Sequence, residues 1–324
     1  MPEKLSAWLL KGPTGGLVLP FDIFILFVLR IIYLATRISL KVVLGKRRRD
    51  KLYSKGRLSY FNDDFSASFL ALTYVSHIKK FLRLGNNLLL KLNVPKYNYK
   101  VYCPANKDDF INMTIREDDL LERFNPKEGE VVVDVGAHIG RYTLISSKRV
   151  GPKGKVIAIE AHPSVLKMLD KNIKLNHLTN VTTLNYAVYS KETKIKLYDH
   201  RKQVDATIYN TVMTGRVRDQ DVFVEVDANT LDNLLHQNGI NAEDVNWIKI
   251  DVEGAELEVL RGANNVLSKS KNITMLVEIH NVDGKSKNFY TTIMDLLGQH
   301  NFKIEFEKSY DSGEKHVILR KHPV

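Results

Sequence analysis

Four ionisable side chains have a spacing that would bring them into one site. Asp251 and Glu253 lie two residues apart after an apolar run, and Glu278 and His280 lie two residues apart at the end of another. Side chains two apart in extended backbone point the same way, and open α/β sheets bind ligands at the carboxyl ends of their strands. We therefore predict that three carboxylates and one imidazole converge, a set suited to taking a proton from a hydroxyl group.

A glycine turn further upstream predicts the ligand of that site. The apolar run beginning at Val131 ends in Asp134, and Gly136 and Gly140 follow at the spacing D-x-G-x-x-x-G. Such a turn between a strand and a helix brings backbone N–H groups close to a ligand. His138 stands where a dinucleotide fingerprint has its second glycine. The pattern favours S-adenosylmethionine, whose amino-acid end is zwitterionic and carries no phosphate.

An acidic residue supports a nucleoside ligand. Glu160 follows Gly140 by 20 residues, the distance at which a βαβ unit places a carboxylate under a ribose. Asn185 ends the third predicted strand and could read the adenine base, although an ordinary strand terminus is an equal alternative. The predicted cofactor site comprises Asp134, Gly136, Ala137, His138, Gly140, Thr143, Glu160, Ala161, Asn185 and Asp251.

The converging group has three interpretations. In the first, His280 has a near-neutral pKa and is the general base for a hydroxyl that attacks the sulfonium methyl group. In the second, His280 and one or more carboxylates hold a divalent ion that lowers the pKa of the acceptor. In the third, the carboxylates cap the following helix or bond to backbone amides, as we expect for Glu256. We favour the first, assign no metal ligand, and assign as catalytic residues Asp251, Glu253, Glu278 and His280.

The elements that position these residues alternate from residue 130 onward. Strands are expected at 130–135, 155–160, 181–186, 246–251, 273–279, 302–307 and 315–320. Helices are expected at 140–149, 163–176, 229–238, 255–268 and 287–299. This alternation is typical of a doubly wound α/β fold, here with a seven-stranded, mostly parallel sheet. The short link between the last two strands requires an antiparallel C-terminal hairpin.

The segment 191–228 interrupts this alternation. It contains strand-like pieces at 194–198, 206–209 and 222–226. We expect a hairpin-like insertion that shapes the acceptor site, and the alternative is a surface loop without that role.

The first hundred residues differ in charge from the rest. Residues 1–100 carry 18 Lys and Arg against 5 Asp and Glu, whereas residues 101–324 carry 30 against 32. A nucleic-acid enzyme would more often have its basic face beside its active site. The distribution therefore favours an anionic membrane surface and no nucleic-acid partner. The single cysteine, Cys103, excludes an intramolecular disulfide and fits the cytoplasmic location that we expect.

A long apolar segment at 17–44 is followed by a short basic run. Its four charged residues fall within one quadrant of a helix. A helix in the headgroup plane explains this stripe, a spanning helix explains the length, and a helix packed on protein is the third alternative. We expect peripheral membrane association through residues 17–49, with a single-pass anchor as the alternative.

The remaining N-terminal part is predicted to be a helical extension. A helix is expected at 64–92, followed by a turn and a short strand, and a further helix is expected at 114–125. The predicted domains are a membrane-associating segment at 1–50, a helical extension at 51–105 and a catalytic domain at 106–324.

Four motifs in this chain resemble the FkbM family of S-adenosylmethionine-dependent methyltransferases. They are Asp134-x-Gly-Ala-x-Ile-Gly140, Glu160-Ala-His-Pro163, Thr230-Leu-Asp-Asn-Leu-Leu235 and Lys249-Ile-Asp-Val-Glu-Gly-Ala-Glu256. The resemblance covers roughly residues 100–300 and implies a Rossmann-like class I methyltransferase fold. It also implies methyl transfer to a hydroxyl, often of a sugar, glycan or polyketide. By that likeness Asp134, Gly136 and Glu160 bind the cofactor and Asp251 lies by the methyl group.

Two positions depart from the family pattern. His138 stands where the family usually has asparagine, and Ala161 where it usually has proline. Neither change removes a group that methyl transfer requires. The sequence thus predicts a membrane-associated O-methyltransferase acting on a glycan or lipid-linked hydroxyl. The alternatives are an RNA methyltransferase with a basic N-terminal arm and a non-catalytic scaffold that retains the cofactor.

Overall fold

The computed structural model describes residues 89–104, 107–114, 117–199, 210–211, 222–280, 286–311 and 313–322. Internal contacts divide the chain into two units, which are Met1–Lys96 with Tyr102–Thr114 and Tyr97–Val101 with Ile115–Val324. No helix within the described ranges is long and apolar enough to cross a membrane. The segment 17–49, predicted to contact a membrane, lies outside those ranges.

The first unit contains the strand β1 (Leu89–Val94) and the helix α4 (Lys107–Thr114). A 3-10 turn, Pro95–Tyr97, leads to β2 (Tyr99–Pro104), which pairs with β1 and is the short strand expected after the turn. The helix predicted at 64–92 is wrong for residues 89–92, which belong to β1. Residues 64–88 lie outside the described residues. Leu92 and Val94 are at least partly buried while Lys91 is exposed, an alternation that suits a strand.

A seven-stranded sheet forms the centre of the second unit. Its order is β12-β13-β11-β10-β3-β4-β5. Neighbouring strands from β11 to β5 are parallel, and β13 is antiparallel to β11 and β12. The predicted sheet and its C-terminal hairpin are confirmed. The strands are β3 (Val131–Val135), β4 (Lys155–Ile159), β5 (Val181–Leu184), β10 (Val245–Ile250), β11 (Thr274–Ile279), β12 (Phe302–Ser309) and β13 (Lys315–Lys321).

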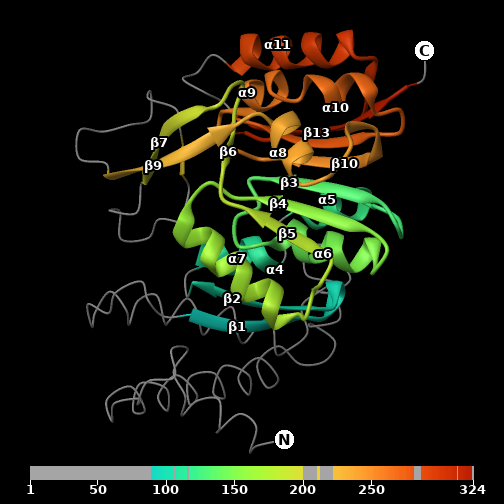
Figure 1. The fold of residues 1–324 in the computed structure, drawn as a ribbon. Helices are drawn as coiled ribbons and strands as arrows, with labels where there is room; N and C mark the ends of the chain where they lie inside the picture. The colour runs from blue at the N-terminus through green and yellow to red at the C-terminus, as the bar shows by residue number, and fades with distance from the viewer. Residues whose placement is uncertain are drawn as a thin grey trace, which may run out of the picture. The chain divides into compact units, whose positions relative to one another are not determined.

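Helices pack on both faces of this sheet, as the alternation predicted. One buried cluster joins β3, β10 and β11 to α8–α11, and another joins Ala158 of β4 to Leu169 and Ile173 of α7. Figure 1 shows α9, α10 and α11 grouped together, apart from α6 and α7. The helices are α5 (Asp118–Arg123), α6 (Arg141–Val150), α7 (Pro163–Leu175), α8 (Leu231–Gln237), α9 (Glu256–Arg261), α10 (Asn264–Lys269) and α11 (Ser286–Gln299), and η3 (Ala242–Asp244) is a 3-10 turn.

The single helix predicted at 255–268 is wrong, because the chain forms α9 and α10 in its place. Gly262 separates them and lies so close to the backbone of Tyr189 that a side chain would collide with it. The carboxylate of Asp232 accepts the N–H of Asn265 at 2.7 Å, which caps the start of α10. A tertiary contact and a cap from another helix therefore divide this segment.

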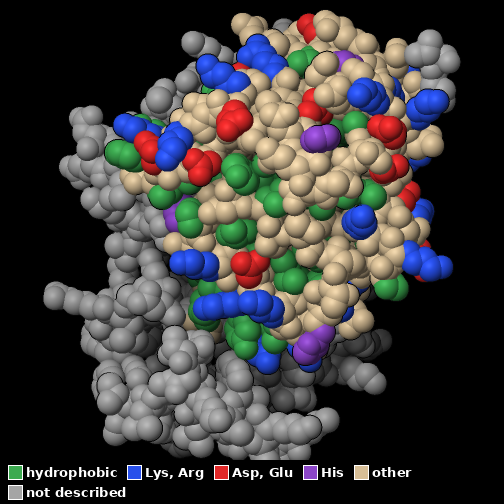
Figure 2. Space-filling model, in the orientation of Figure 1, with side chains coloured by type: hydrophobic (Ala, Val, Ile, Leu, Met, Phe, Trp, Pro, Cys, Tyr) green, Lys and Arg blue, Asp and Glu red, His purple; other side chains and the backbone are tan. Residues whose placement is uncertain are grey.

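The insertion after the third core strand forms a second sheet, of order β6-β9-β7-β8. Its strands are β6 (Ala187–Val188), β7 (Thr193–Asp199), β8 (Asn210–Thr211) and β9 (Val222–Asn229). The antiparallel β7–β9 pair confirms the strands expected at 194–198 and 222–226, while the piece expected at 206–209 lies outside the described residues. Figure 2 shows basic, acidic and hydrophobic side chains interspersed over this part. Nζ of Lys194 on β7 lies 3.6 Å from Oε1 of Glu225 on β9.

The turn after β3 packs directly on the end of β10. Gly136 has a left-handed φ of 74°, and a Cβ there would overlap the carbonyl oxygen of Asp251. The N–H of Asp251 in turn donates to the carbonyl of Val135 at 3.1 Å. Only glycine permits both the backbone angle and the close approach.

We expect Gly136→Ala to destabilise the fold far more than Gly239→Ala. Gly239 has a similar φ of 68° but no neighbouring atom within 4 Å, so its substitution costs only the left-handed backbone penalty of about 1–2 kcal/mol. Gly136→Ala adds the collision with Asp251, about 1–3 kcal/mol more. Urea unfolding followed by circular dichroism measures both. Equal losses would show that the close approach is not required.

Candidate active site

The side chains predicted to converge at the ends of β10 and β11 lie together. Nε2 of His280 is 3.4 Å from Oε2 of Glu253 and 4.0 Å from Oδ1 of Asp251. Oε1 of Glu278 lies 3.6 Å from the same nitrogen. The strands β10 and β11 are parallel neighbours, so their carboxyl ends bring the four groups to one edge of the sheet.

Glu256 holds the imidazole in place. It is fully buried, and its Oε1 lies 2.7 Å from Nδ1 of His280 and accepts the N–H of Gly254 at 2.9 Å. The second contact is a bond to a backbone amide, as expected, but it does not cap α9, because Gly254 precedes the N-cap Ala255 and that residue has no side-chain cap. The first contact, which the sequence analysis missed, fixes the ring so that Nε2 faces the other carboxylates.

The charges of these groups differ from those expected. Burial opposes a charge on His280, but the hydrogen bond to Glu256 and the nearby carboxylates outweigh it and raise the pKa of His280 to about 11. The near-neutral pKa predicted for His280 is wrong, and the ring is an imidazolium at neutral pH. Burial raises the pKa of Glu253 to about 8, although His280 opposes the shift. For Asp251 burial acts upward, but the Lys249 ammonium and His280 hold its pKa below the ordinary value.

The four side chains differ in their exposure to solvent. The side chains of Asp251 and Glu253 are 31% and 20% exposed. His280 is only 3% exposed and Glu278 9%. Asp251 and Glu253 are therefore the more accessible members of the group, and their contact with a ligand stays a prediction.

Glu160 is oriented by the glycine turn. Its two carboxylate oxygens accept the N–H groups of His138 and His162, each at 2.8 Å. The N–H groups of Gly136 and Ala137 both donate to the carbonyl of Ile159 at 3.0 Å. These turn N–H groups are thus bonded within the protein and are not directed at a ligand, a correction of the role expected for them. His138 adopts a φ of 51°.

Two predicted cofactor-site residues, Thr143 and Asn185, form hydrogen bonds that hold the turns after β3 and β4. Thr143 donates to Asp134 at 2.6 Å, and both side chains are fully buried. Asn185 donates to the carbonyls of Glu160 and Ala161 at 2.9 and 2.8 Å. These bonds brace the turns, and direct contact of these side chains with the cofactor stays a prediction.

The remaining predicted positions are small residues in the same two turns. Gly140 is the N-cap of α6 with a φ of 105°. Ala137 packs in a buried cluster with Leu169, and Ala161 packs against the insertion sheet. Their contacts are structural, and contact with a cofactor stays a prediction.

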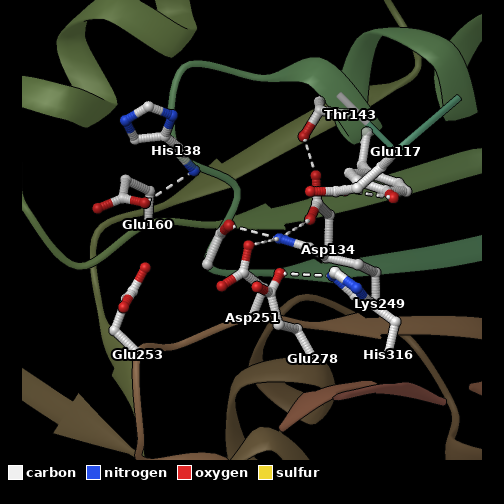
Figure 3. Close-up of polar contacts among 12 residues, drawn as sticks. Glu117, Asp134, His138, Thr143, Glu160, Lys249, Asp251, Glu253, Glu278 and His316 are labelled. Atoms are coloured by element: carbon white, nitrogen blue, oxygen red, sulfur yellow. Dashed lines mark hydrogen bonds and ion pairs between the residues drawn. The ribbon is translucent and has the colours of Figure 1, made fainter. Parts of the chain in front are cut away.

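Glu117 and His316 extend the charged network on the far side of Glu278. Nε2 of His316 lies 2.9 Å from Oε2 of Glu278, and the hydroxyl of Tyr142 donates to Glu117 at 2.8 Å. Figure 3 shows Glu117 and His316 with the central acids. His316 was not among the predicted site residues, although a histidine directly before the apolar run Val317–Leu319 of β13 was a signal. It faces Glu278 in the antiparallel register.

The residues present fit a positively charged cofactor. Glu160 is held with both oxygens oriented. Four acids at the ends of β10 and β11, Asp251, Glu253, Glu256 and Glu278, face three basic groups, Lys249, His280 and His316. A positive charge between these turns would relieve the repulsion. The ligand atoms of Asp251, Glu253 and His280 also lie within 4.8 Å of one another, so the alternative of a divalent ion stays open.

The Methyltransferase FkbM domain matches residues 134–304, more than half of the chain. The chain belongs to the FkbM methyltransferase family. S-adenosylmethionine is the cofactor of this methyltransferase, as the glycine turn predicted, and Glu160 lies with that turn at one side of the site.

Two relatives that are named as methyltransferases agree with this assignment. "Methyltransferase 1" of Beauveria bassiana is 27% identical over 184 residues, which are 52% of this chain and 73% of that protein. "Hexuronic acid methyltransferase AglP" of Haloferax volcanii is 31% identical over 211 residues, 62% of this chain and 74% of that protein. The crystal structure of Aeropyrum pernix fibrillarin, with natively bound S-adenosyl-L-methionine, is 15% identical. The superposed residues are 60% of this chain and 67% of the fibrillarin chain, and the TM-score is 0.39.

We expect Glu256→Gln to lower the pKa of His280 by at least about one pH unit, because a neutral amide no longer stabilises the imidazolium. NMR titration of the ring measures this directly. Glu258→Gln is the control, since Glu258 pairs with Arg261 at 2.7 Å. An unchanged pKa in Glu256→Gln would show that Glu256 does not control the charge.

The same substitution changes how stability depends on pH. The pKa of His280 in the fold lies above its ordinary value of 6.5. Its charge therefore stabilises the fold fully below pH 6.5, and the contribution is lost as pH rises toward 11. Glu256→Gln consequently loses less unfolding free energy between pH 7 and 10 than the wild type.

Proposed function

We propose that this methyltransferase methylates a hydroxyl oxygen of a sugar or glycan, with Glu253 as the general base. The observation that carries the proposal is the partly exposed Glu253 carboxylate, which lies 3.4 Å from the buried imidazolium of His280 and whose pKa burial raises to about 8. When bound, S-adenosylmethionine supplies an electrophilic methyl group on a positively charged sulfur. A hydroxyl acceptor must lose its proton as it accepts that group.

Each residue of the cluster has a distinct part in this proposal. Glu253 receives the proton of the acceptor hydroxyl at its carboxylate. His280 is already protonated and takes no further proton, but it holds Glu253 through Nε2 while Glu256 holds its Nδ1. Asp251, kept anionic by Lys249, orients the acceptor through its exposed carboxylate.

The acceptor class is supported by a relative and by the insertion. AglP is named as a hexuronic acid methyltransferase, and a sugar offers the hydroxyl groups that this site suits. The β7–β9 pair enters the fold after β6 and before β10, where we propose that it shapes the acceptor site. We also propose a membrane location, which the apolar and basic segment at 17–49 supports.

Glu253→Gln tests the catalytic step. We expect its rate of methyl transfer to fall about 10²–10⁴-fold, because the amide cannot accept the proton, while Glu258→Gln keeps its rate. The wild-type rate should rise with pH and level off above about pH 8, as Glu253 loses its proton. The assay follows labelled methyl from the cofactor into separate glycan, lipid and RNA fractions.

Three results of that assay would contradict the proposal. Label in the RNA fraction alone would favour the basic-arm alternative, and no label in any fraction would favour the non-catalytic scaffold. Activity that a chelator abolishes and Mg²⁺ restores would show that a divalent ion, and not Glu253, activates the hydroxyl.

Removal of residues 1–49 tests the membrane proposal. We expect the full chain to sediment with vesicles that contain anionic lipid, and the shortened chain to remain in solution, because the apolar and basic segment is gone. Neutral vesicles are the control for charge. Equal binding of both proteins to the anionic vesicles would show that this segment is not the membrane contact.

A further inference from the structure

Lys249 is a buried lysine in the central strand β10. Its side chain is only 6% exposed, and a buried ammonium is strongly unfavourable unless oppositely charged and polar groups surround it. β10 lies between β3 and β11 in the sheet, and Lys249 is in register with Asp134 of β3. Lys249 thus lies just before the ends of β3 and β10, where the two turns of the site begin.

The ammonium contacts both of these turns. Nζ of Lys249 donates to the carbonyl oxygen of Gly136 at 2.8 Å and lies 3.6 Å from Oδ1 of Asp134. On the other side it lies 3.3 Å from Oδ2 of Asp251. Figure 3 shows the Lys249 side chain reaching between these groups. One cation thereby joins the end of β3 to the end of β10.

The two turns carry opposite halves of the reaction. The turn at Gly136 leads to His138, whose N–H orients Glu160 on the cofactor side. Asp251 belongs to the exposed acids on the acceptor side. Methyl transfer requires the two halves at a fixed separation, because misplacement of reacting groups by about 1 Å can cost 10²-fold in rate.

We infer that Lys249 is a positioning residue for methyl transfer, which holds the cofactor turn and Asp251 in one arrangement. The inference rests on the family's methyl transfer and not on the hydroxyl acceptor proposed above. Lys249 touches the two turns and acts through them. Its loss therefore loosens both turns together and weakens cofactor binding, beyond any general loss of stability.

Lys249→Met removes the ammonium and retains the length of the side chain. We expect it to weaken binding of S-adenosylhomocysteine, measured by calorimetry on the full chain, by at least about tenfold. Hydrogen exchange should become faster in the two turns, at 135–140 and 251–254. The control is Lys155→Met, since Lys155 is exposed at the start of β4. If Lys249→Met is not folded at 25 °C, Lys249→Gln, which keeps an N–H donor without charge, replaces it.

Rescue by a small cation separates positioning from simple stabilisation. In Lys249→Ala, ethylammonium should restore part of the lost affinity, because it supplies N–H donors and charge in the vacated space. Tetramethylammonium, which has no N–H, should not. A folded Lys249→Met with unchanged affinity and unchanged exchange in both turns would overturn the inference. So would lower thermal stability with no change in affinity. No acceptor is used, so these outcomes are independent of hydroxyl methylation.

Discussion

The arrangement of the site depends on the close approach of two strand ends in the middle of the sheet. Gly136 follows β3 and lies against the carbonyl of Asp251 at the end of β10, where a side chain could not fit. The N–H of Asp251 bonds to Val135, and Lys249 joins both turns from below. The cofactor turn and the acidic cluster are therefore parts of one packed junction.

The second constraint is charge. Carboxylates at this junction outnumber the cations that face them, and burial raises the pKa of Glu253 and of Glu278. His280 is held as an imidazolium by a fully buried Glu256. Such a site is best satisfied by a ligand that brings a positive charge, and the sulfonium of S-adenosylmethionine is one. Burial, with a smaller contribution from the neighbouring acids, raises the pKa of Glu253 to about 8, so that its carboxylate becomes available to accept a proton as pH rises toward 8.

Much of the fold could be predicted because buried parallel strands are continuous apolar runs with helices between them. The errors came from contacts outside the local sequence. The helix at 255–268 is divided because Gly262 meets Tyr189 and Asp232 caps the second half. The end of the helix at 64–92 is strand β1, which pairs with β2.

By itself the sequence determined the family, the cofactor and the convergence of acids at two neighbouring strand ends. The family follows from the resemblance of four local motifs. The cofactor and the convergence follow from local spacing, because period-two side chains and strand order need little more than the alternation of elements. The tertiary structure alone decided the charge of His280, the exposure of Glu253 and the bridging position of Lys249. Those properties depend on groups distant in the chain, whose burial and mutual distances arise only when the strands are packed side by side.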